Sequence, residues 1–369
     1  MCTLVKPLHP NEKEVFYTLD AMRGVAAICV MAYHFMPWLS SKPLLPSSYL
    51  AVDLFFLLSG FVIAHAYNGR FSQGMTLLAF ARIRLIRLFP LYLIGTGLGL
   101  AYFILRLRLE PNKPIALPYL GRETFLSLLM LPQMGKGALP GLYPFDPAAW
   151  SLFLEVLANI AYCAAFRFIT TRRLIVFVAA SAVLLACRGW THGSLDMGMG
   201  PETLLGGALR CAFGVSLGTL LYRVRPRRQI CPPEVGLYLA VLVFATHPNL
   251  GARYAYDLAA AFVVFPALLM ISTHTRVGSR QEVFEFAALL SYPVYLLHTP
   301  LLLIGLGAFK GLAHTDPSRP APAVGLAIMA GVLVASYVTA RWVDLPLRSY
   351  LSAYFMKRRA PISGIASIA

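Results

Sequence analysis

Two ionisable residues stand at an informative spacing in the first apolar run. Arg23 and His34 are eleven residues apart, which on an α-helix is three turns and about 20°, so both lie on one face. The rise between them is roughly 16 Å, which places Arg23 at one membrane surface and His34 near mid-membrane. Arginine can bind an anion, and histidine can move a proton near neutral pH. The alternative for His34 is a histidine that hydrogen-bonds between packed helices.

A second pair of arginines precedes Leu88-Phe89-Pro90. Arg84 and Arg87 are three residues apart, so their guanidinium groups share a helix face. Paired arginines suit polyphosphate, because each can bond bidentately. The alternative is that they only anchor the helix at the cytoplasmic surface. Their predicted position on the same side as Arg23 favours phosphate binding.

A serine and a carboxylate open a later apolar run. Ser151 and Glu155 follow Trp150 and share a face at i, i+4. We expect both at the outer end of this span, where Arg210 of another span could pair with Glu155. A structural ion pair is the alternative to a functional one.

Further polar groups lie within other apolar runs. Asp53 is expected near the outer end of the second run, and Ser59 with Gly60 would let a helix or a ligand approach closely. Tyr295 and His298 are neighbours on one face of a later run, with His298 near mid-membrane.

Only a membrane protein accommodates this composition. Of 369 residues 58% are hydrophobic and 13% charged, and the mean hydropathy is +0.67. We predict an all-α, polytopic helical bundle with no soluble domain. The net charge of +16 is explained by the excess of Lys and Arg in cytoplasmic loops, and not by nucleic-acid binding. The six cysteines form no C-x-x-C and indicate no metal site.

About ten transmembrane helices are expected, with membrane lipids around them. The predicted spans are 23–39, 50–69, 88–106, 149–169, 173–189, 203–222, 235–248, 255–273, 285–307 and 322–342. The run 121–134 is short for a span, and we expect it to be re-entrant or interfacial. With that choice, 21 of the 32 basic residues fall on the cytoplasmic side.

Both termini are therefore predicted to be cytoplasmic. Residues 1–22 would form a cytoplasmic segment, 23–348 the membrane domain and 349–369 a disordered cytoplasmic tail. The layout suits a phosphate-bearing donor on the cytoplasmic side, an acceptor on the outer side and transfer at a histidine between them. No phosphate-binding glycine loop or nucleophile elbow occurs in the sequence.

Five motifs in order resemble acyltransferase family 3. They are LDAMRGVAAICVMAYHF with its R-x10-H pattern, FFLLSGF at 55–61, RLIRLFP at 84–90, WSLFLE at 150–155 and SYPVYLLHTP at 291–300. The closing Asp344-Leu345-Pro346 has Asp where the family has Glu. The resemblance runs from Asp20 to Pro346.

The resemblance implies a membrane O-acyltransferase of the bacterial inner (plasma) membrane. The donor would be cytoplasmic acyl-CoA, with acetyl the expected group. The acceptor would be a hydroxyl of a carbohydrate or lipid-linked glycan, such as exopolysaccharide, O-antigen or lipo-oligosaccharide. We expect no bound cofactor, and acyl-CoA is a substrate. Whether the acyl group passes through an acyl-histidine stays open.

Roles follow for the candidate residues. A sugar hydroxyl needs a base, and His34 is the first choice, with His298 as its rival and a carboxylate, Asp53 or Glu155, to orient it. The predicted donor ligands are Arg23, Arg84 and Arg87. The residues predicted to support the reaction or to contact the acceptor are Ser59, Trp150, Ser151, Arg210, Tyr295 and His298. The alternative function is a transporter that uses Arg23, His34, Glu155 and Arg210 as a substrate or proton relay.

Overall fold

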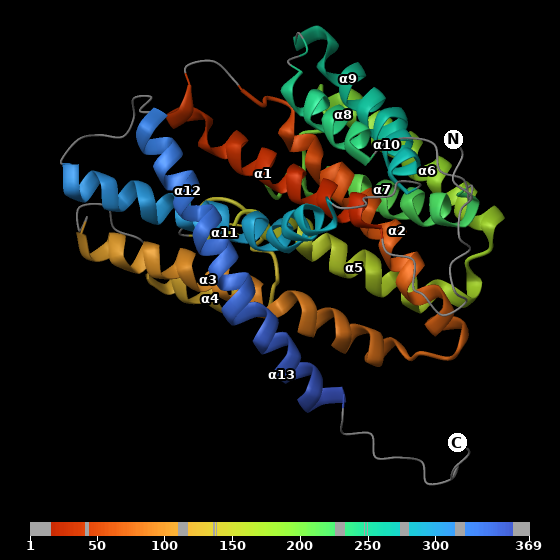
Figure 1. Cartoon of the computed structure of the whole chain (residues 1–369), viewed down its shortest axis with the longest axis horizontal. Coiled ribbons are helices and arrows are strands. Elements are labelled where there is room, and N and C mark those ends of the chain that lie inside the picture. The colour runs from red at the N-terminus through yellow and green to blue at the C-terminus, as the bar shows by residue number, and fades with distance from the viewer. Residues whose placement is uncertain are drawn as a thin grey trace.

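A computed structural model describes most of the chain and shows a bundle of helices (Figure 1). The described residues are 16–40, 44–109, 117–135, 137, 139–225, 233–246, 248, 250–273, 280–313 and 322–356. Within them no strand occurs. The predicted all-α class is therefore confirmed.

The helices follow one another along the chain with few long connections. In order they are α1 (Tyr17–Leu39), the 3₁₀ turn η1 (Ser48–Leu50), α2 (Ala51–Ser72), α3 (Leu77–Leu109), α4 (Leu117–Leu128), α5 (Ala149–Ala165), η2 (Phe166–Phe168), α6 (Thr171–His192), α7 (Leu204–Val224), α8 (Pro233–Ala245), η3 (Leu250–Ala252), α9 (Arg253–Ala259), η4 (Ala260–Val264), α10 (Phe265–Ser272), α11 (Gln281–Ala313), α12 (Pro322–Val338), η6 (Thr339–Asp344) and α13 (Leu345–Met356).

Nine helical segments in the described chain are long and apolar enough to cross a membrane. The one predicted span without such a segment, 235–248, corresponds to α8. Its 13 residues make a helix of about 20 Å, which is shorter than a hydrocarbon core of roughly 30 Å. The run 121–134 overlaps α4, whose 12 residues span about 18 Å and are too short to cross alone.

Several predicted boundaries differ from the observed helices. α1 begins at Tyr17, inside the predicted segment 1–22, because the side chains of Thr18 and Leu19 pack in the core. α13 continues to Met356, so the first residues of the predicted disordered tail are helical. Residues 357–369 lie outside the described chain.

Glycines bring two pairs of helices into close contact. A Cβ atom on Gly60 of α2 would overlap the backbone of Val215 in α7, and one on Gly218 would overlap the backbone of Leu57. A Cβ atom on Gly24 of α1 would likewise overlap the backbone of Ala287 in α11. Backbones that approach this closely gain van der Waals contact that larger residues would prevent. α1, α2, α7 and α11 are thereby held as a compact centre.

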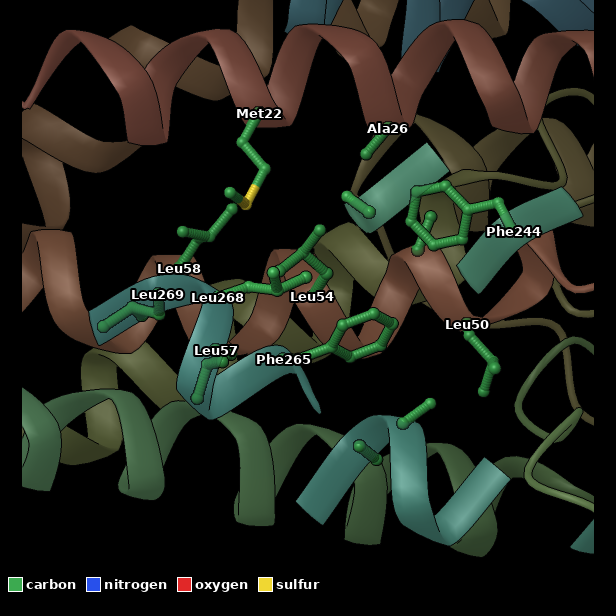
Figure 2. Packing of buried hydrophobic residues seen from close by; sticks show 14 of the residues in the cluster. Met22, Ala26, Leu50, Leu54, Leu57, Leu58, Phe244, Phe265, Leu268 and Leu269 are labelled. Carbon is green, nitrogen blue, oxygen red and sulfur yellow. The ribbon is translucent and has the colours of Figure 1, made fainter. Parts of the chain in front are cut away.

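A cluster of buried apolar side chains fills the space beside this centre (Figure 2). Met22 of α1 meets Leu58 of α2, and Phe265 and Leu268 of α10 reach toward the same helix. Such packing fixes the relative positions of the helices that carry the polar residues described next.

Candidate active site

A cavity of about 360 Å³ gathers arginines from three helices. We call it the arginine pocket. Its polar lining consists of Asp20, Arg23, Ser59, Arg84, Arg87, Glu155, Glu285, Tyr292 and Arg348. The three arginines predicted to bind a donor thus lie together. Arg23 comes from α1, Arg84 and Arg87 from α3, and Arg348 from α13, so the pocket brings together four positive charges.

Glu155 lies in the arginine pocket rather than at the outer end of α5. Its Oε1 accepts a hydrogen bond from Arg84 Nη2 at 2.9 Å and another from Ser59 Oγ at 2.7 Å. The prediction that Glu155 pairs with Arg210 is therefore wrong. The reason is that the segment before α5 is buried, with Phe145 and Asp146 at most 1% exposed, so α5 starts deep in the bundle.

A second cavity, of about 450 Å³, contains both histidines of interest. We call it the histidine pocket. Its lining includes Tyr33, His34, Ser48, Tyr49, Trp150, Asp196, Thr203, Arg210, Tyr295, His298 and Thr299. Aromatic rings, hydroxyls and two imidazoles therefore face one space, a combination that can bind and deprotonate a polar acceptor.

The two imidazoles face each other. The ring centroids of His34 and His298 are 5.1 Å apart, with 32° between the ring planes. Nδ1 of His298 lies 3.0 Å from the carbonyl oxygen of Val294 and 2.8 Å from that of Tyr295. Because a carbonyl oxygen only accepts, Nδ1 carries the hydrogen and Nε2 has a lone pair. This Nε2 is buried and has no hydrogen-bond partner among the described residues.

Asp53 and Arg210 form a buried ion pair beside the histidine pocket. Arg210 donates to both carboxylate oxygens of Asp53, at 3.0 and 2.7 Å, and to the carbonyl oxygens of Met197 and Tyr49, at 2.7 and 2.9 Å. Its guanidinium also lies 5.7 Å from the ring of Trp150. The pair ties α2 and α7 to the segment around Met197, which is a wall of the pocket.

Neither predicted carboxylate hydrogen-bonds to His34 in the described structure. Asp53 is engaged by Arg210, and Glu155 by Arg84 and Ser59. The expectation that one of them orients the His34 imidazole is therefore wrong. The ring partner that the structure provides is His298.

Four helices, α1, α2, α5 and α11, line both pockets; α2 does so with Val52 in the histidine pocket and Ser59 in the arginine pocket. α1 carries Arg23 in one and His34 in the other, and α11 likewise carries Tyr292 and His298. α5 contributes Glu155 to the arginine pocket and Trp150 to the histidine pocket. The pockets are therefore stacked along the helix axes, about 8–16 Å apart by the helical rise between these pairs.

Tyr295 of the histidine pocket lies on α11 one turn from Tyr292 of the arginine pocket. The Tyr295 hydroxyl is 2.7 Å from Ser151 Oγ, which is itself 3.2 Å from the carbonyl oxygen of Ala148. Ser151 donates to that carbonyl, so Tyr295 donates to Ser151. The Tyr295 ring packs edge-on against Phe55 at 5.2 Å.

The sequence prediction omitted several lining residues. Arg348 and Asp20 belong to the arginine pocket, and Tyr33, Tyr49 and Asp196 to the histidine pocket. Arg348 could have been found from Asp344, one turn earlier, because the two form an i, i+4 ion pair. Asp196 lies in an irregular segment between α6 and α7, where no periodicity indicates which way a side chain points.

The bundle and its two stacked polar pockets define a polytopic membrane protein whose site is enclosed by its helices. A family model described as an acyltransferase domain matches residues 16–341. The chain belongs to acyltransferase family 3 and is an acyltransferase, so the transporter alternative is discarded.

Part of the chain is similar to a bacterial protein. Over 180 residues the chain is 39% identical to Protein 2 in picA locus of Rhizobium radiobacter; the match covers 47% of this chain and 93% of that protein. No solved structure matches the chain significantly.

Proposed function

We propose that this acyltransferase moves an acyl group, with acetyl the first choice, from acyl-CoA to a hydroxyl of a carbohydrate or lipid-linked glycan. The observation that carries the proposal is the stacking of the arginine pocket and the histidine pocket on α1, α2, α5 and α11. Phosphates of the donor would bind the arginines, and its acyl end would extend toward the imidazoles. The acceptor would enter the histidine pocket from the opposite side.

The excess of basic residues on the side of the arginine pocket favours a cytoplasmic location for it. Acyl-CoA is then available on the correct side, and the acceptor pocket opens outward. A bacterial inner membrane has this arrangement, and the similar protein is bacterial. Both termini would then be cytoplasmic, with α8 as the tenth crossing: Glu234 at its start pairs with Arg280, and Thr246 beyond its other end accepts a hydrogen bond from Ser47.

The base is assigned to His34 because its side chain is partly exposed to the pocket, whereas His298 is 1% exposed. Neutral His34 accepts the hydroxyl proton while the hydroxyl oxygen bonds to the thioester carbonyl carbon. When the carbon–sulfur bond breaks, the imidazolium returns the proton to the CoA thiolate. The products are an ester and CoA, and no additional reactant is needed.

His298 would assist without touching the acceptor. Its lone pair at Nε2 faces no other partner in the described chain, and its ring lies against His34. It can therefore stabilise the positive charge that develops on His34, the role first sought among carboxylates.

The proposal is tested by glycan mass spectrometry in cells that lack the protein or carry variants of it. His34→Ala should remove most acylation, since base assistance is worth about 10²–10⁴-fold. The matched control is His65→Ala, because His65 packs against Phe16 and Tyr222 away from both pockets. Equal acylation by both variants at matched protein levels would refute the assignment of the base. Unchanged glycans in cells without the protein would refute the acceptor class.

A further inference from the structure

Arg348 enters the arginine pocket from a helix that none of the five motifs includes. It is carried by α13, which follows the last predicted span and extends away from the bundle (Figure 1). Arg348 and Leu345 nevertheless line the pocket together with Arg23, Arg84 and Arg87. α13 thus forms one wall of a cavity whose other walls are membrane-spanning helices.

An irregular helical segment turns this wall toward the pocket. η6, which ends at Asp344, is a π-helix and so contains more residues per turn than the α-helix before it. An extra residue rotates everything that follows by about 100° around the helix axis. Asp344 is consequently fully buried, and Arg348, one turn later, reaches the pocket.

The guanidinium of Arg348 is only partly used. It forms an ion pair with Asp344 through Nη2, while its Nε is buried and has no partner among the described residues. Oδ1 of Asp344 is also buried without a partner in that part of the chain. Arg348 therefore keeps a donor edge that a phosphate could accept from.

Exposure separates Arg84 from Arg348, and Arg87 of the same pocket is exposed. The side chain of Arg84 is 6% exposed and that of Arg348 is 25% exposed. Arg84 is already paired with Glu155 at the bottom of the pocket, whereas Arg348 stands nearer the opening. A long donor that enters with its acyl end first leaves its nucleotide end beside Arg348 and the exposed Arg87.

We propose that Arg348 is a specificity-determining residue for the donor, which binds the phosphates at the nucleotide end of acyl-CoA. The proposal rests on the proposed function. Asp344 holds the guanidinium in place from below, and α13 presents it at the opening. A thioester that lacks the nucleotide, such as one of phosphopantetheine, cannot use this contact.

The test measures binding of CoA and of 4′-phosphopantetheine to the purified full-length protein in lipid nanodiscs by calorimetry. Arg348→Ala should weaken CoA binding about tenfold and change phosphopantetheine binding less than about twofold, because only CoA carries the nucleotide phosphates. Arg348→Lys should show a smaller loss of CoA affinity, since it keeps the charge without the fork. The control is Arg341→Ala, an exposed arginine of η6 outside the pocket.

The outcomes separate this inference from the proposed function. Equal losses for both ligands in Arg348→Ala would show that Arg348 only supports the fold of the pocket, and would overturn the inference. CoA affinity equal to that of Arg341→Ala would overturn it as well. If the unmodified protein bound no CoA, the proposed function itself would fail. Thermal unfolding of each variant verifies that it is folded.

Discussion

Removal of the Glu155 charge should destabilise the protein, because Glu155 balances the positive charge of the arginine pocket. Glu155 accepts hydrogen bonds from Arg84 at 2.9 Å and Ser59 at 2.7 Å, and the two charged side chains are 12% and 6% exposed. Glu155→Gln keeps the shape but leaves Arg84 without its counter-ion beside Arg23 and Arg87. Breaking a buried pair in this way costs about 3–5 kcal/mol. We expect about 3 kcal/mol, the lower end of this range, because both side chains keep some exposure.

The assay is thermal unfolding of the purified protein with and without CoA. Glu155→Gln should melt well below the unmodified protein, and CoA should restore more stability to the variant, because phosphate supplies the missing negative charge. The control is Asp196→Asn, which breaks the ion pair with Arg253. Those side chains are 38% and 33% exposed, so this change should cost at most about 1 kcal/mol. Equal melting of the two variants would refute the reasoning.

Three further predictions concern the stability of the helix bundle around the pockets. Asp53→Asn removes the counter-ion of the buried Arg210 and should destabilise the protein by about 3–5 kcal/mol in thermal unfolding. A loss below about 1 kcal/mol would contradict a stabilising role for this ion pair. Burial raises the pKa of Asp146 well above its usual value, so this carboxyl favours folding at low pH and loses that contribution as pH rises through the folded-state pKa. Asp146→Asn should therefore gain stability over the unmodified protein at pH 9 relative to pH 5, and a constant difference would contradict this. Gly60→Ala should destabilise by at least about 1–3 kcal/mol, because its Cβ overlaps the Val215 backbone; unchanged unfolding would show that α2 and α7 can separate.

Helical periodicity predicted well what lies on one continuous helix. The eleven-residue spacing of Arg23 and His34 placed them at two levels of α1, and the structure has one in each pocket. The three-residue spacing of Arg84 and Arg87 likewise placed both in one cavity. Apolar run lengths predicted the helical class, because a helix that crosses a bilayer must be long and apolar.

Depth and partners across helices could not be predicted in the same way. Glu155 was assigned to the outer end of its span because the sequence does not show that the segment before α5 is buried. The same error gave it Arg210 as a partner, although Arg210 belongs to Asp53. The π-helix before α13 was also invisible, since no residue type specifies it, and Arg348 was missed as a result.

The central claim is that donor and acceptor approach the site from opposite faces of the membrane. The most direct measurement uses sealed vesicles with the protein in one known orientation and radiolabelled acetyl-CoA supplied at either face. We expect label to reach an acceptor on the far side only when acetyl-CoA is supplied at the face that bears Arg84. We also expect Arg84→Ala and His34→Ala both to lose this transfer. Labelling of an acceptor on the same side as the donor, or unchanged transfer by both variants, would contradict it.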